Sequence, residues 1–377
     1  MVEGRSGPGS GNGQVPLHLI DAGSWLGTEP KPRLFLDGSS RLLPMRNVTL
    51  LGGDGGTGKS LLALQLALAC CTAIPKWIGM EVTPGPVLYV SCEDNEAEIH
   101  RRVREICAAE DGSDIDAIRG RLFVLDLAGQ DATLAAEKPR TGLVEPTHLY
   151  RRMLQLIGDI NPVLVTLDTL ADVYSGNENS RPAVRHFLSL LRKPALDYDL
   201  VMLLLGHPSV SGRSSGTGES GSTAWSNSVR SRLYLKAGAA DDDDRVLETK
   251  KANYGKVGGI IGLKWVLNRF VRKEVPKAAD KMTMDTQDVI REVASTGQWR
   301  AWPNSEQWLG FWLADHLGVD VGQGMPAADR TALQRQARNE IMNLLKQFEN
   351  GGVIHKVVRK DNNRELRPYY DGGPGKK

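Results

Sequence analysis

Residues 50–71, "LLGGDGGTGKSLLALQLALACC", join a short apolar run to an apolar helical pattern through a loop that is mostly glycine. Gly53, Gly58, Lys59 and Ser60 have the spacing G-x-x-x-x-G-K-[ST] of a phosphate-binding loop. Glycines let backbone N–H groups close around phosphate oxygens, and the positive end of the helix dipole adds to the attraction. The stretch therefore predicts a strand, a phosphate-binding loop and a helix in succession.

The loop predicts a site for ATP and Mg²⁺. We expect Lys59 to reach the β and γ phosphates and Ser60 to ligate Mg²⁺. A glycine-rich turn that binds nothing is the alternative, and the strand and helix context disfavours it. The expected nucleotide-binding residues are Gly53, Asp54, Gly55, Gly56, Thr57, Gly58, Lys59, Ser60 and Leu61.

Apolar runs alternate with helical patterns along the following chain, which indicates a mostly parallel sheet covered on both faces. The expected strands lie at 47–53, 85–93, 121–127, 162–170 and 200–207, and the expected helices at 60–71, 94–110, 145–160 and 181–199. The pattern then changes to strands joined by turns at 231–237, 244–252 and 258–268. The sequence thus predicts an α/β fold with an antiparallel extension.

Polar side chains stand where three of these runs end. Asp168 closes "PVLVTLDTL" and is expected to hold the metal together with Ser60. Glu93 either positions water at the sheet edge where ligands bind or complements a helix N-terminus. His207 closes "LVMLLLGH" and either senses the γ-phosphate or is a surface histidine.

The composition of the 377 residues is that of an intracellular globular protein. Hydrophobic residues make up 41% and the net charge is +2, so the charge of the whole chain names no partner. We expect a cytoplasmic protein without a membrane partner, because no apolar stretch reaches the roughly 18 residues of a span and the start lacks a signal-peptide core. The four cysteines, which are expected to be buried free thiols, are Cys70, Cys71, Cys92 and Cys107.

Six motifs in order carry a resemblance over about residues 44–268. They are "GGDGGTGKS", "VLYVSCEDNEAEIHRR", "VTLDTLADVYSGNENSR", "LLLGHPS", "GSTAWSNSVRSRLYL" and "KKANYGK". This order resembles the RecA-type hexameric helicase family typified by plasmid RepA proteins, which is often described as AAA-family ATPases. The resemblance implies a RecA-like P-loop core that hydrolyses ATP at the subunit interfaces of a homo-hexameric ring.

The resemblance also implies roles for particular residues. Glu93 would polarise the attacking water and His207 would couple the γ-phosphate to DNA, so that both join Lys59 and Asp168 as catalytic residues. An arginine would reach the ATP of the neighbouring subunit and stabilise transition-state charge. Arg230 is the best match, and we count it as catalytic. The other candidates for this trans finger are Arg232 and Lys250. Ala252 and Asn253 stand where some relatives carry arginine.

Two polar segments are candidates for single-stranded DNA. The segment 208–224 follows His207, where RecA-like rings carry a DNA-binding loop, and Arg213 is its one cation. A disordered surface loop is the alternative. The segment after Asp168 would be a companion loop, with Arg181 as a weaker candidate.

The chain from 283 to 371 predicts a second, smaller domain with helices followed by two strands around "KDNN", a pattern that resembles a winged helix. Residues 330–377 hold eleven Lys or Arg against five Asp or Glu, a net charge of +6. This region would contact duplex DNA or a protein. Candidate DNA contacts are Arg335, Arg338, Lys346, Lys356, Arg359, Lys360 and Arg364. The expected organisation is a disordered leader (1–20), the ATPase domain (21–272), a linker (273–282), the winged-helix-like domain (283–371) and a flexible tail (372–377).

Three functions are consistent with these features. The first is an ATP-dependent replicative DNA helicase of a phage, plasmid or integrated element. The second is a RecA-class recombination or repair ATPase that binds single strands without unwinding. The third is an ATP-controlled docking module for which DNA is incidental. The motif order favours the first.

Overall fold

The computed structural model describes residues 19–72, 75–109, 115–138, 144–207, 223–238, 242–273 and 286–372. Most of the expected leader and linker, the loop residue Arg213 and the end of the expected tail lie outside these ranges. The chain divides into residues 1–33 and a larger unit, 34–377. The first unit contains one short 3-10 helix, η1 (Ala22–Trp25), capped by Asp21.

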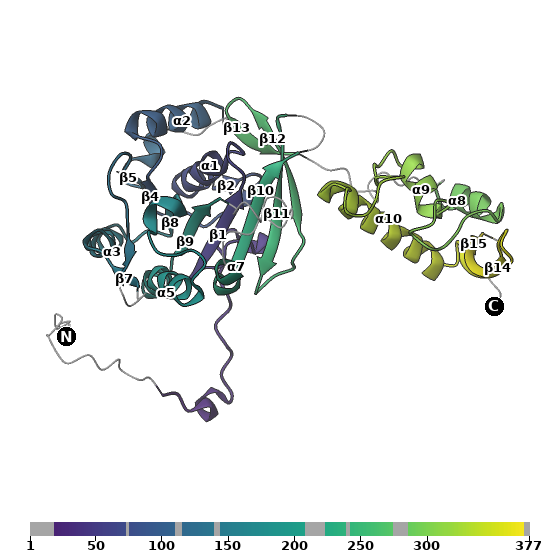
Figure 1. The fold of residues 1–377 in the computed structure, drawn as a ribbon, viewed down its shortest axis with the longest axis horizontal. Helices are drawn as coiled ribbons and strands as arrows, with labels where there is room; N and C mark the ends of the chain where they lie inside the picture. Colours follow the sequence, from purple (N-terminus) through teal and green to yellow (C-terminus); the bar gives the residue numbers. More distant parts are fainter. Residues whose placement is uncertain are drawn as a thin grey trace. The chain divides into compact units, whose positions relative to one another are not determined.

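A nine-stranded sheet forms the centre of the larger unit, in the order β13-β12-β11-β10-β1-β9-β8-β4-β5 (Figure 1). Neighbours from β10 to β5 pair in parallel, and β10 to β13 pair antiparallel. The α/β fold with an antiparallel extension is thus confirmed. The strands are β1 (Asn47–Gly53), β4 (Val87–Ser91), β5 (Leu122–Asp126), β8 (Leu164–Asp168), β9 (Val201–Gly206), β10 (Ser231–Ala237), β11 (Asp244–Ala252), β12 (Ile260–Val266) and β13 (Arg269–Arg272).

Helices cover both faces of this sheet. In β9, Leu203 and Leu205 face one hydrophobic layer, and Met202 and Leu204 face the other. Because both faces are buried, the strands read as continuous apolar runs rather than alternating ones. The first layer includes α1 (Lys59–Cys71) and α2 (Glu96–Ala109), and the second includes α3 (His148–Ile160), α5 (Arg181–Asp197) and α7 (Thr223–Ser228).

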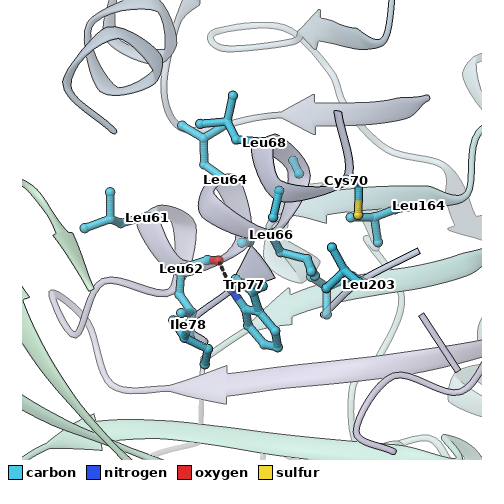
Figure 2. Packing of buried hydrophobic residues seen from close by; sticks show 14 of the residues in the cluster. Leu61, Leu62, Leu64, Leu66, Leu68, Cys70, Trp77, Ile78, Leu164 and Leu203 are labelled. Atoms are coloured by element: carbon cyan, nitrogen blue, oxygen red, sulfur yellow. Dashed lines mark hydrogen bonds between the residues drawn. The ribbon is translucent and has the colours of Figure 1, made fainter. Parts of the chain in front are cut away.

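The helix that follows the glycine-rich loop is buried on nearly every side (Figure 2). The indole N–H of Trp77 donates to the carbonyl of Leu62 at 3.0 Å. On the side of the sheet, Leu66 of α1 lies toward Leu203 and Cys70 lies beside Leu164. Each fully buried leucine contributes about 2 kcal/mol. This packing fixes the start of α1, and with it the position of the loop.

Smaller elements complete this part of the chain. They are η2 (Gly38–Ser40), β2 (Lys76–Trp77), β3 (Met80–Glu81), η3 (Ile115–Ile118), β6 (Ala135–Glu137), β7 (Val144–Pro146) and α4 (Leu170–Val173). All four cysteines are free and buried, which confirms that expectation. Within the described ranges, no helix has both the length and the apolar character needed to cross a membrane.

Residues 286–372 have a hydrophobic cluster of their own, which includes Trp308, Leu313 and Ile341. A capping box between Thr331 and Gln334 begins the longest helix. The helices and the hairpin expected from the sequence are present, and the winged-helix assignment stays a prediction. The elements are α8 (Thr286–Ser295), α9 (Leu309–His316), α10 (Ala332–Asn350), β14 (His355–Lys360) and β15 (Leu366–Asp371).

Candidate nucleotide site

Four predicted site residues meet at one edge of the sheet. Strands β1, β4, β8 and β9 are parallel, so their carboxyl ends lie together. Lys59 follows β1, Glu93 follows β4, Asp168 ends β8 and His207 follows β9. Residues far apart in the sequence are therefore gathered by topology alone.

The Lys59 ammonium lies folded back along its own loop. Its Nζ donates to the carbonyl of Gly53 at 2.9 Å and to that of Asp54 at 3.0 Å, and it lies 3.3 Å from Nδ1 of His207. The side chain is 5% exposed, so its charge is shielded from solvent. A lysine held at the mouth of the loop in this way is placed to meet phosphate oxygens.

Two glycines of the loop are required by close neighbours. Gly58 has φ +93°, and a Cβ there would lie 2.6 Å from the ring of Phe270 in β13. A Cβ on Gly53 would lie 2.5 Å from the carbonyl oxygen of Leu235 in β10. The Gln65 side chain of α1 accepts from the Phe270 N–H and donates to its carbonyl. The antiparallel extension therefore packs directly against the phosphate-binding loop.

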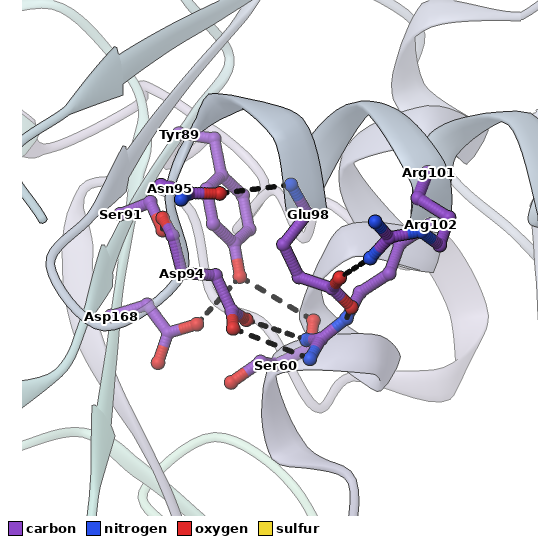
Figure 3. Close-up of polar contacts among 9 residues, drawn as sticks. All are labelled: Ser60, Tyr89, Ser91, Asp94, Asn95, Glu98, Arg101, Arg102 and Asp168. Carbon is purple, nitrogen blue, oxygen red and sulfur yellow. Dashed lines mark hydrogen bonds and ion pairs between the residues drawn. The ribbon is translucent and has the colours of Figure 1, made fainter.

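Asp168 is 2% exposed and lies at the base of the site (Figure 3). Burial raises the pKa of its carboxyl to about 6, against hydrogen bonds from Tyr89 and Ser60 that lower it. The Tyr89 hydroxyl donates to Oδ2 at 2.8 Å, whereas Oδ1 is buried without a hydrogen-bond partner. A desolvated carboxylate with an unused oxygen beside a serine hydroxyl is a donor set suited to a cation.

This donor set fits Mg²⁺. Magnesium takes oxygen ligands, typically one or two carboxylates with water and substrate phosphates. Ser60 and Asp168 supply a hydroxyl and a carboxylate, and the phosphates of a bound nucleotide would supply the rest. Across the described ranges no cluster of three or more His, Cys, Asp or Glu side chains forms an all-protein metal site. The chemistry therefore favours a metal that arrives with its nucleotide.

Glu93 and His207 face each other across the mouth of the site. Oε1 of Glu93 lies 4.0 Å from Nε2 of His207, and the two side chains are 54% and 35% exposed. Because Lys59 donates to Nδ1, the proton of a neutral His207 belongs on Nε2, toward Glu93. Glu93 is thus open to solvent and held within reach of the loop, as a water-positioning carboxylate requires.

A cleft of about 380 Å³ opens above these residues. Part of its lining is an ion-pair cluster at the start of α2, in which Arg102 of the helix pairs with Glu98 and with Asp94, two residues before the helix (Figure 3). Another part of the lining contains Trp265 and Asn268 of the β12–β13 hairpin.

Sequence reasoning missed three parts of this site. They are the Tyr89 hydroxyl, the Arg102 cluster and the β12–β13 hairpin. The signal for Tyr89 was a tyrosine inside a buried apolar strand, since its hydroxyl needs a partner there.

The trans-finger candidates lie away from the glycine-rich loop of their own chain. Arg230 precedes β10, where its N–H donates to Val48 at the start of β1, and its Nε is buried without a hydrogen-bond partner. About 17 Å of strand separates Val48 from the loop at Gly53. Arg232 is buried beside Ser226, 3.5 Å from its hydroxyl.

Lys250 is held in a cluster on β10 and β11. Its Nζ lies 2.5 Å from Oε2 of Glu248 and over the ring of Tyr234, and Glu248 also pairs with Lys236. The Tyr234 hydroxyl donates to Oδ1 of Asp54 at 3.3 Å, so the acidic side chain of the loop has a partner in β10.

The proposed DNA contacts of the C-terminal region differ in their surroundings. Arg338 is 6% exposed, stacks 4.4 Å from the centre of the Trp308 ring and donates to Pro303. It supports the fold from inside, so its assignment to a DNA surface is wrong. Arg359 pairs with Asp371.

Among the other predicted DNA contacts, some cations have an acidic partner and others have none. Lys356 pairs with Glu349 at 2.8 Å. No carboxylate in the described ranges pairs with the exposed cations, which are Arg181, Arg335, Lys346, Lys360 and Arg364.

A comparison with protein families identifies the core. The family described as "AAA domain" matches residues 16–213, more than half of the chain. The chain belongs to this family. Its phosphate-binding loop, Glu93, Asp168 and His207 all lie within the matched residues.

Two relatives extend the comparison. The chain is 27% identical over 179 residues to a DNA repair protein RadA of Synechocystis, covering 44% of this chain and 30% of that protein. It therefore spans less than a third of the curated relative. A crystal structure of a KaiC-like protein from the archaeon Pyrococcus horikoshii aligns with a TM-score of 0.42 and 15% identity, covering 65% of this chain and all of that one.

Proposed function

We propose that this protein is an ATP-dependent DNA translocase, a replicative helicase of the RepA-like type that works as a ring of identical subunits on single-stranded DNA. The observation that carries the proposal is the convergence of Lys59, Glu93 and His207 on one cleft, together with Asp168 beside Ser60 of the same cleft. The order of the six sequence motifs supports the helicase reading within the ATPase family.

In this proposal each side chain has one task. Lys59 would bind the β and γ phosphates, and Ser60 and Asp168 would hold Mg²⁺, which neutralises phosphate charge when bound. Glu93 would orient the attacking water and accept its proton at the carboxylate. His207 contacts both Lys59 and Glu93, so a shift of its strand end would reach both catalytic groups at once.

Arg230 would complete the site of a second copy. The roughly 17 Å of β1 between Val48 and its own loop is longer than an arginine side chain, which supports action on a second copy rather than within one chain. A cation supplied in trans stabilises transition-state charge, so turnover would depend on assembly. Arg232 and Lys250 are weaker candidates because both have partners within the sheet.

Similarity to a DNA repair protein RadA favours a second candidate. In that reading the chain is a RecA-class recombination or repair ATPase that binds single strands without separating duplexes. Both candidates predict DNA-stimulated turnover, and only the first predicts unwinding. A docking module controlled by ATP predicts neither.

The test is steady-state ATP turnover with and without single-stranded DNA at low salt, followed by a strand-separation assay. We expect DNA to stimulate turnover and duplexes with a single-stranded tail to be unwound. Glu93→Gln should keep ATP binding and lose turnover. The control is Glu96→Gln, which changes an exposed residue at the start of α2 that does not line the cleft and should retain turnover. Turnover indifferent to DNA would refute the translocase proposal.

A further inference from the structure

A second cavity lies at the opposite end of β1 from the nucleotide cleft. It has a volume of about 320 Å³ and is lined by Asn47 and Val48 of β1, by one face of α5 and by the end of α7. Three arginines contribute to it, which are Arg185, Arg192 and Arg230. No described residue that lines the cavity is acidic.

The arginines come from two elements. Arg185 and Arg192 are seven residues apart on α5, so two helical turns place them on the same face. Arg230 joins them from the start of β10, where its backbone is fixed by Val48 and Asn253. The three charges are therefore brought together by the packing of α5 against α7 and β10.

No carboxylate in the described residues forms an ion pair with Arg185, Arg192 or Arg230. The Nε atoms of Arg192 and Arg230 are buried without a hydrogen-bond partner. The positive charge extends to Lys251, whose Nζ donates to the carbonyls of Ser226 and Asn227. Burial, with the charge of Arg230 added to it, lowers the pKa of that lysine.

Like charges around one cavity repel each other, and an anion bound between them would remove that repulsion. A guanidinium presents its N–H groups in a planar fork that matches two oxygens of a phosphate. A pocket with three such groups and no carboxylate is therefore built for a compact oxyanion with more than one charge. The hydroxyl of Ser189 and the amide of Asn227 line the same cavity and offer further donors.

We propose that Arg185, Arg192 and Arg230 form a phosphate-binding pocket whose ligand is the terminal phosphate of a nucleotide carried by a second copy of this chain. The choice of occupant rests on the proposed function of Arg230, whereas the pocket itself does not. Arg185 and Arg192 would then hold the phosphate together with Arg230, so that a cluster rather than one arginine acts between subunits.

The pocket is tested with inorganic phosphate and the full chain. Lys59→Ala removes phosphate binding at the glycine-rich loop, and the melting temperature is then followed as phosphate replaces chloride at constant ionic strength. We expect phosphate to raise the melting temperature, because a ligand that binds only the folded protein stabilises it. Arg192→Gln in the same background should weaken phosphate binding about tenfold, while the protein in chloride melts no lower because repulsion is relieved.

Two further variants control this experiment. Arg152→Gln changes an exposed arginine on α3 and should leave the phosphate response intact. If Arg192→Gln does not fold, Arg185→Gln, which changes an exposed residue, takes its place. An undiminished phosphate response in the pocket variants would overturn the proposal. Neither ATP turnover nor assembly enters this measurement, so its outcome is separate from that of the proposed function.

The occupant is tested by turnover and DNA affinity. If a second copy's nucleotide fills the pocket, Arg185→Gln loses turnover even without DNA, and mixing it with Lys59→Ala protein restores part of that turnover. Affinity for a thymidine oligonucleotide in the absence of nucleotide should not change. Loss of that affinity with unchanged turnover would overturn the assignment and give the pocket to DNA backbone phosphates instead.

Discussion

The nucleotide cleft and the C-terminal hairpin both gather charged side chains, but they differ in which charges are buried and which are paired. In the cleft, Asp168 keeps one buried oxygen without a partner and Glu93 stays open to solvent. In the hairpin, Arg359 and Arg367 are paired with neighbouring carboxylates. An unpartnered, buried carboxylate oxygen beside the phosphate-binding loop thus offers a place for a ligand, whereas the number of charges alone does not.

The largest effect is expected from Asp168→Asn, which removes the metal ligand of the cleft. ATP turnover should fall at least about a hundredfold. Because burial raises the pKa of this carboxyl to about 6, its ionised form opposes folding at pH 8, and the elevation corresponds to roughly 3 kcal/mol. The nucleotide-free variant should therefore melt at a higher temperature than the parent.

This gain in stability has a defined pH dependence. A folded-state pKa above the unfolded value of 3.8 means that the folded protein binds the proton more tightly, so the cost of ionisation grows as the pH rises from about 4 to 6. The advantage of Asp168→Asn should be full above about pH 6 and vanish near pH 4. If Asp168→Asn melts at a lower temperature than the parent at pH 8, the buried carboxylate does not oppose folding and this prediction is wrong.

The next largest effect is expected in the C-terminal region. Arg338→Ala removes a buried cation from the faces of Trp308 and Phe311 and should lower the free energy of unfolding by about 3 kcal/mol. Arg335→Ala, on the exposed side of the same helix, should change it by less than about 0.5 kcal/mol. Urea unfolding followed by tryptophan fluorescence measures both. Equal effects would place Arg338 on the surface after all.

A smaller effect concerns Mg²⁺ and pH. Asp168 carries a proton below about pH 6, and a protonated carboxyl is a poor metal ligand. The affinity for Mg²⁺ in the presence of nucleotide should fall up to about tenfold for each pH unit below that value and level off above it. Titration of Mg²⁺ between pH 5 and 8 measures this. If the Mg²⁺ affinity of Asp168→Asn changes with pH as steeply as that of the parent, the titrating group belongs to the nucleotide and not to Asp168.

The smallest effects separate paired from unpaired cations of the hairpin. Lys360→Gln and Arg364→Gln should each weaken DNA binding about two- to threefold and lower its salt dependence by about one charge. Arg359→Gln and Arg367→Gln should change it less, because carboxylates already occupy these guanidinium groups. DNA affinity measured at several salt concentrations provides the comparison. Equal DNA affinities for all four variants would show that pairing with a carboxylate does not decide which cations contact DNA.

Much of the nucleotide site was predictable because it depends on chain order. The glycine spacing around Lys59 predicted the loop, and apolar runs ending in Asp168 and His207 predicted a shared sheet edge. What remained hidden depends on contacts across the sheet. The Phe270 ring packs against Gly58, and the Tyr89 hydroxyl donates a hydrogen bond to Asp168. No local sequence pattern connects the residues of either pair.

Charge was the least reliable guide. The net charge of +6 over residues 330–377 predicted an extended basic surface, yet Arg338 is buried and two hairpin arginines are paired. Residues 181–193 hold four Arg or Lys and no Asp or Glu, but this run does not reveal that Arg185 and Arg192 line one cavity with Arg230. A sequence gives the charges but not the distances between them.

By itself, the sequence determined the α/β fold, the phosphate-binding loop and the order of the residues that follow the strands, because strand and helix patterns are local properties of the chain. Only the tertiary structure decided which polar atoms stay without partners, such as Oδ1 of Asp168 and Nε of Arg192. Desolvation and pairing depend on every element packed around a group, and that packing exists only in the folded protein.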